Sequence, residues 1–162
     1  MGDPGEPNWL DDEERQSWYA LALLLNRLPA ALDTQMQRDT GISQFEYMVL
    51  SALSMAPDRT MRMSLLAEYA GASLSRLSNV VARLEKRGWV TRSPDPASGR
   101  TTLAALTEEG MAVVTEAAPM HVAEVRRLVI DPLTKTQQQQ LGAIATRILR
   151  ALDPTQERSA HP

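Results

Sequence analysis

The sequence predicts a mainly helical α+β fold in which a small β-hairpin follows two short helices. Three observations support this. Apolar side chains recur every three or four residues over most of the chain, glycines separate short helical runs, and two β-prone runs flank a loop containing Pro, Ser and Gly. The chain has 162 residues, of which 43% are hydrophobic, so it can form one globular domain with a modest core.

The two short helices and the hairpin occur together in residues 64–107, and the rest of the chain is expected to support this segment. Gly71 supplies a tight turn between the two helices. Ser73 occupies the N-cap position of the second helix, which is expected to end at Gly88. The second helix is therefore bounded at both ends.

This second helix has two different faces. A period of 3.6 residues predicts an apolar inner face made by Leu74, Leu77, Val80, Val81 and Leu84. The outer face is polar and mostly small, with basic flanks, and consists of Ser75, Asn79, Ala82 and Lys86 flanked by Arg76, Ser78 and Arg83. Small hydroxyl and amide groups can approach base edges, and arginines pair with guanine edges or phosphates. The alternative interpretation is the solvated face of an ordinary amphipathic helix.

A hairpin follows the helix. Residues 89–92 and 101–106 are β-prone, and residues 93–100 form a loop with two prolines and a glycine. The exposed tip of this hairpin carries Arg100, which is placed to reach a phosphate or the adjacent minor groove. Helix, turn, helix and hairpin in this order predict a winged helix-turn-helix.

The charge distribution agrees with this prediction. Residues 59–100 contain eight basic and three acidic side chains, a local charge of +5, whereas the whole chain has a charge of −3. The remainder therefore carries −8. A basic segment in an acidic protein is typical of a surface that binds phosphates.

These residues resemble the MarR family of bacterial transcriptional regulators. The matching motifs are LAE at residues 66–68, RLEKRGWVTR at residues 83–92, the wing arginine Arg100, and LTEEG at residues 106–110. The resemblance extends over nearly all of residues 12–152. Two positions depart from the family pattern: Ser98 stands where the wing motif usually has an acid that pairs with the wing arginine, and Trp89 replaces a smaller aliphatic residue.

The N-terminal third is expected to begin with a flexible segment at residues 1–10. An N-terminal dimerisation helix follows at residues 11–39, with acids in its first turn and with Pro29 expected to kink or split it. Ser43 and Glu46 form a capping-box pattern before a helix at residues 44–55. An extended segment then precedes the first helix of residues 64–107, and Ser64 is a candidate cap for that helix. The whole DNA-binding lobe is expected at residues 40–107.

The C-terminal dimerisation helices are expected at residues 108–152. The first runs to about Val129, with a kink expected at Pro119, and the second follows a Thr134 cap. A flexible tail is expected at residues 153–162. The terminal helices carry more apolar surface than one small lobe can cover, and the resemblance implies that they interlock in a homodimer.

The functional expectation is a homodimeric, sequence-specific regulator, favoured as a repressor, that binds a pseudo-palindromic operator in double-stranded DNA. The residues expected to contact DNA are Arg62, Ser73, Ser75, Arg76, Ser78, Asn79, Arg83, Lys86 and Arg100. The resemblance also implies a small aromatic effector, for which the candidate residues are Trp18, Arg27, Met36, Tyr47 and Met48. The alternative interpretation of the same side chains is that they belong to the hydrophobic core. The alternative function is a winged-helix protein-interaction module without an operator.

Other functional classes have little support in the sequence. No nucleophile and base pair, Gly-rich phosphate loop or metal-binding cluster can be assembled, so no catalytic residue, metal or cofactor is expected. The absence of cysteine excludes sensing by thiol oxidation. Neither a membrane span nor a signal peptide is indicated, and a cytoplasmic location is expected.

Overall fold

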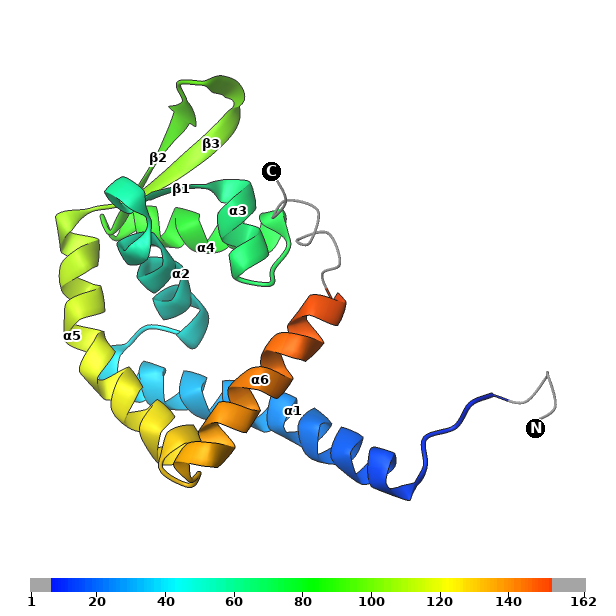
Figure 1. Cartoon of the computed structure of the whole chain (residues 1–162). Helices are drawn as coiled ribbons and strands as arrows, with labels where there is room; N and C mark the ends of the chain where they lie inside the picture. Colours follow the sequence, from blue (N-terminus) through cyan, green and yellow to red (C-terminus); the bar gives the residue numbers. More distant parts are fainter. Residues whose placement is uncertain (1–6, 153–162) are drawn as a thin grey trace. The chain divides into compact units, whose positions relative to one another are not determined.

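The computed structural model describes residues 7–152 (Figure 1). The tail expected at residues 153–162 and most of the segment expected at residues 1–10 lie outside the described residues. The chain divides into two compact units, one extending to His121 and the other beginning at Val122. Within the described residues, no helix is both long enough and apolar enough to cross a membrane.

Helix α1 (Asp12–Thr40) begins with a capping box in which Asp11 accepts a hydrogen bond from the Glu14 backbone and Glu14 accepts one from the Asp11 backbone. Asp11 is thus the cap itself and does not belong to the first turn. The helix continues through Pro29, so the expected split does not occur. An interior proline removes one backbone hydrogen bond, which the remaining turns of a 29-residue helix tolerate.

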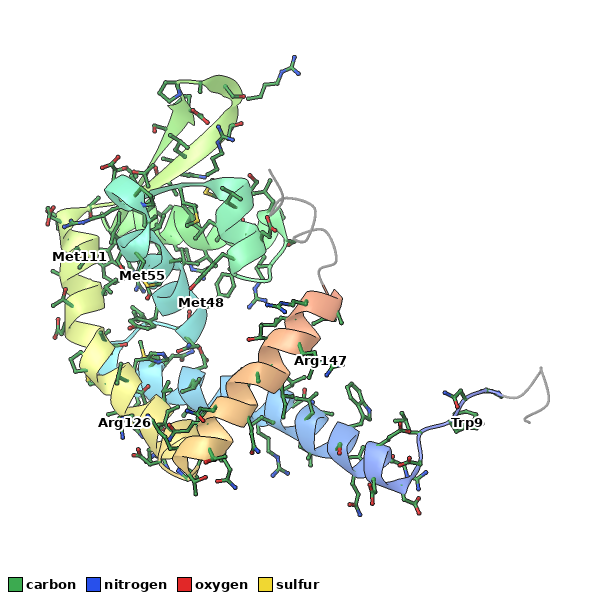
Figure 2. The ribbon with its side chains drawn as sticks, viewed as in Figure 1. Trp9, Met48, Met55, Met111, Arg126 and Arg147 are labelled. Carbon is green, nitrogen blue, oxygen red and sulfur yellow. The ribbon has the colours of Figure 1, made fainter. Side chains whose placement is uncertain are left out.

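Helix α2 (Gln44–Met55) starts as the sequence predicts. The hydroxyl oxygen of Ser43 accepts from the Glu46 backbone at 3.1 Å, and the Glu46 carboxylate accepts from the Ser43 backbone at 2.9 Å. This helix supplies Val49, Leu50 and Leu53 to the core, where each is fully buried. Figure 2 shows Met48 and Met55 on this helix and Met111 on a later one.

Strand β1 (Thr60–Arg62) leads into α3 (Met63–Tyr69), the turn at Gly71, and α4 (Leu74–Lys86). The predicted turn is confirmed, because Gly71 has a φ of 57°, which favours glycine. The cap expected at Ser64 is wrong. Ser64 lies inside α3, and the preceding Arg62 makes no side-chain cap.

Strands β2 (Val90–Asp95) and β3 (Ser98–Leu106) form the hairpin, which extends beyond α2, α3 and α4 in Figure 1. The sheet is antiparallel with the order β1-β3-β2. Both strands are longer than predicted, since only two residues separate them, and a bulge lies between Pro94 and Asp95. Arg100 therefore lies within β3 and not in the turn.

Helix α5 (Glu108–Val125) follows, capped by the Thr107 hydroxyl, which accepts from the Gly110 backbone at 3.0 Å. It includes Pro119 without interruption. The predicted continuation to Val129 is replaced by a π-helical segment, Arg126–Ile130. Helix α6 (Lys135–Leu152) begins at the predicted Thr134 cap, which exchanges hydrogen bonds with Gln137.

Candidate nucleic-acid interface

Helix α4 is fixed at both ends by local hydrogen bonds. The Ser73 hydroxyl accepts from the Arg76 backbone at 3.2 Å. At the other end, Gly88 has a φ of 76° and donates to the carbonyl of Glu85, while Trp89 donates to the carbonyl of Leu84. This pair of bonds is the Schellman motif that commonly ends helices at glycine.

Four of the five predicted inner residues of α4 are buried: Leu77, Val80, Val81 and Leu84. The fifth, Leu74, is 54% exposed, so its predicted inward orientation is wrong. It is the first residue of the helix and precedes the turns that pack on the core. Ser75, Asn79 and Lys86 are not buried, as predicted for the outer face.

One flank of this face lies against the beginning of α2. The guanidinium of Arg76 lies over the ring of Phe45, 4.4 Å from its centroid. Arg83 Nε is 3.5 Å from Oε1 of Glu46, a carboxylate that is almost completely buried. A hollow of about 440 Å³ separates these residues from α1, and Asp33 and Gln37 line its far side.

The other flank is joined to the hairpin. Arg92 donates two hydrogen bonds to Oε2 of Glu85, at 3.0 and 2.7 Å, and the Arg92 backbone donates to Oε1 of the same carboxylate. These bonds lower the pKa of Glu85. They connect the last turn of α4 directly to β2.

Arg62 and Arg100 have different surroundings. Arg62 Nε donates to the buried carboxylate of Asp95 at 3.0 Å, which joins β1 to the end of β2. Arg100 is exposed and has no acid within 4 Å among residues 7–152. This agrees with the prediction that Ser98 leaves the wing arginine without its usual partner.

A second hollow, of about 280 Å³, lies between α3, α4 and the hairpin. Six of its eight lining residues carry a hydroxyl or guanidinium group, namely Ser64, Ser78, Arg92, Arg100, Thr101 and Thr102, and the other two are Met63 and Leu74. No carboxylate is among these residues. Predicted contact residues from α4 and the hairpin are thus brought to one surface.

The basic residues of the segment fall into two groups. Four are paired with acids: Arg59 with Glu108, Arg62 with Asp95, Arg83 with Glu46, and Arg92 with Glu85. The other four have no acid within 4 Å in the described part of the chain, and these are Arg76, Lys86, Arg87 and Arg100. The positive field of this surface comes mainly from the second group, because the first group is locally neutralised.

Comparison with known proteins identifies the family. A model described as MarR family matches residues 40–101. The structure is similar to that of Sco3205, a MarR family transcriptional regulator from Streptomyces coelicolor in complex with DNA, with 43% identity, a TM-score of 0.88, and coverage of 94% of this chain and 95% of that one. The chain belongs to the MarR family of transcriptional regulators.

Two other MarR-type proteins are also similar. AbsC, a MarR family regulator from Streptomyces coelicolor, is 32% identical with a TM-score of 0.85, over 92% of this chain and 100% of that one. The transcriptional repressor MprA of Escherichia coli K12 is 27% identical over 123 residues, which are 76% of this chain and 69% of MprA.

The candidate effector residues of this MarR protein do not surround one pocket within a single chain. Trp18 and Met36 are 18 residues apart on the continuous helix α1, a rise of about 27 Å. Met36 and Tyr47 are buried in the core, whereas Trp18 is 52% exposed and Arg27 is also not buried. Their common role in ligand binding therefore stays a prediction.

A buried histidine nitrogen lies next to Tyr47. The rings of Tyr47 and His121 are 4.7 Å apart, and His121 Nδ1 is buried without a hydrogen-bond partner in the described structure. Burial lowers the pKa of His121 and raises the pKa of Tyr47. Both shifts favour uncharged rings at neutral pH.

The sequence did not reveal the partners of three arginines on this surface. Phe45 and Glu46 contact Arg76 and Arg83 of α4, and Glu85 binds Arg92 of β2. The sequence contained one indication that these two arginines of α4 have neighbours in common. Arg76 and Arg83 are seven residues apart and therefore share a flank of the helix. The identity of the neighbours on that flank depends on tertiary packing, which helical periodicity does not contain.

Proposed function

We propose that this MarR family member is a homodimer that binds a pseudo-palindromic operator in double-stranded DNA and represses transcription. The observation that carries the proposal is the outer face of α4, which is exposed, polar and flanked by unpaired cations beside the hairpin. The crystallisation of the similar regulator Sco3205 with DNA supports it, and the description of MprA as a repressor supports the sign of regulation.

The positions of the side chains support a proposed contact for each residue. Ser75, Asn79 and Arg76 approach base edges in the major groove. Arg83 is paired with Glu46 and lies on the same flank of α4 as Arg76. Ser73 caps the start of α4, and Ser78 lines the hollow between α3, α4 and the hairpin. Lys86, Arg62 and Arg100 contact phosphates, with Arg62 also fixing the base of the hairpin through Asp95.

The test is fluorescence anisotropy with DNA from the promoter region of the protein's own operon, measured at several salt concentrations. Arg76→Ala should weaken specific binding much more than non-specific binding. Arg100→Ala should weaken both and reduce the magnitude of the salt slope by about 0.9 for each phosphate that is no longer neutralised. Lys135→Ala, at the exposed start of α6, is a control with the same charge change. The absence of any salt-sensitive complex at low salt would contradict DNA binding and favour a protein-interaction module.

The homodimer is supported by apolar surface that a single chain leaves exposed. On α1 these side chains are Trp18, Tyr19, Leu23, Leu24 and Leu25, and on α6 they are Leu141, Ile144, Ile148, Leu149 and Leu152. Exposed apolar area of this extent marks an interface. Two-fold symmetry would place the two copies of α4 on half-sites about 34–36 Å apart. Light scattering should give the mass of two chains, and Ile148→Asp should lower it.

We also propose that a small aromatic effector releases the protein from DNA, and that the protein acts in the cytoplasm, where chromosomal DNA is found. An effector can act as a switch only if it binds the DNA-competent and incompetent conformations unequally. In a dimer, the second chain can supply the residues that complete a pocket around Trp18 and Arg27. Thermal-shift screening of aromatic acids, followed by measurement of DNA release, tests this proposal.

A further inference from the structure

We propose that Leu74 contacts the 5-methyl group of a thymine in each operator half-site and so determines part of the sequence specificity. This inference rests on the proposed function, since it requires that α4 enters the major groove of DNA. It assigns a base-reading role to a residue whose helical position predicts burial.

The location of Leu74 suits a base contact. It is the first residue of α4, and the N-terminal residues of a recognition helix are those that approach base edges. The Ser73 cap fixes the backbone at this point through its bond to the Arg76 amide. Leu74 is 54% exposed although every other apolar residue on the inner side of α4 is buried.

The surroundings of Leu74 identify the occupant as DNA. The hollow that it lines also contains the hydroxyls of Ser64, Ser78, Thr101 and Thr102 and the guanidiniums of Arg92 and Arg100. Hydroxyl and guanidinium groups without a carboxylate are complementary to a phosphodiester backbone. An apolar protein segment would leave the guanidinium of Arg100, which has no acid within 4 Å among the described residues, without an acceptor. The leucine and its polar neighbours therefore fit a nucleic acid better.

Thymine is the base that leucine can distinguish. In the major groove, thymine presents a methyl group at the position where cytosine has only hydrogen, next to a different pattern of polar atoms. Leucine has no donor or acceptor, so it gains only from covering apolar surface. Burial of one methyl group is worth about 0.8 kcal/mol, which corresponds to about a fourfold change in Kd.

The experiment begins with selection of operator sequences by the full-length protein from a random duplex library. Each recurrent thymine of the selected half-site is then replaced by uracil, which lacks only the methyl group. Anisotropy measures the Kd of each duplex for the wild type, Leu74→Ala and Leu65→Ala. Leu65 is a matched control, because it is 52% exposed on α3 and does not line the hollow. Circular dichroism verifies that both variants are folded.

We expect one thymine per half-site at which uracil weakens wild-type binding about fourfold, and about fifteenfold when both half-sites are changed. Leu74→Ala should lose this sensitivity, whereas Leu65→Ala should keep it. The inference is overturned if no thymine recurs in the half-site, if uracil has no effect on the wild type, or if Leu74→Ala responds as the wild type does. Failure to select any sequence would overturn the proposed function as well, whereas a selected operator without a methyl effect would overturn only the role of Leu74.

Discussion

Replacement of Gly110 by alanine tests how α5 is attached to the end of α4. A Cβ atom at this position would lie 2.2 Å from the carbonyl oxygen of Trp89 and 2.7 Å from Cδ1 of Leu106. The leucine methyl can move, but the carbonyl belongs to the backbone that follows α4 and accepts a hydrogen bond from the Thr107 amide at 3.0 Å. The backbone would have to shift by about 0.8 Å to lengthen the 2.2 Å contact to 3.0 Å.

The expected free-energy change combines two opposing effects. Alanine in a helix is favoured over glycine by about 1 kcal/mol. Overpacking typically costs about 1–3 kcal/mol and sometimes more, and a clash with backbone belongs at the upper end of that range. We therefore expect Gly110→Ala to lower the free energy of unfolding by about 2 kcal/mol.

Urea unfolding followed by circular dichroism, at one protein concentration for all variants, measures this change. Gly142→Ala in α6 is the control, because no atom from residues 7–152 of the same chain is found within 4 Å of the position that the alanine methyl would take. This control substitution should raise stability by up to about 1 kcal/mol. Equal or higher stability of Gly110→Ala would refute the predicted clash.

Three further outcomes are expected from the same unfolding assay. Ser73→Ala should lower stability by about 1 kcal/mol because the cap of α4 is lost, and an unchanged midpoint would contradict this. Leu84→Ala should cost about 2–5 kcal/mol, whereas Leu74→Ala should cost much less, because only Leu84 is fully buried; equal costs would show that Leu74 packs inward. Burial lowers the pKa of His121, so the unfolded chain binds a proton more readily, and stability should fall as the pH drops below about 6.5. His121→Asn should show a smaller loss between about pH 7.5 and pH 5.5, and an identical pH dependence would exclude His121 as the cause.

Features with a local cause were predictable from the sequence. The caps at Ser43, Ser73 and Thr134 involve partners three residues away, so the pattern of residue types contains them. The turn at Gly71 and the helix end at Gly88 depend on backbone conformations that glycine favours. The order of the elements follows from these signals.

The extent of the strands was not predictable. Pro94 suggested a loop, because proline cannot donate a hydrogen bond to a neighbouring strand. In the structure β2 is an edge strand, paired only with β3 within the described sheet, and a proline is tolerated there. Whether a strand lies at an edge depends on the arrangement of the whole sheet.

The candidate site was predictable in its residues but not in its interactions. Periodicity identified the exposed face of α4, yet it also placed Leu74 inside, because a helical wheel does not show where packing begins along the axis. The pairs Arg62–Asp95 and Arg92–Glu85 join residues 33 and 7 positions apart, and their formation depends on how the hairpin folds.

The stacking of Arg76 on Phe45 has a thermodynamic consequence for recognition. An aromatic ring attracts the guanidinium through its face, so it restricts the rotamers of the arginine without occupying any of its five N–H donors. A side chain that is already ordered loses less entropy when it meets its acceptor. Arg76 is thus preorganised with its full donor capacity, whereas its neighbour Arg83 directs part of that capacity towards Glu46.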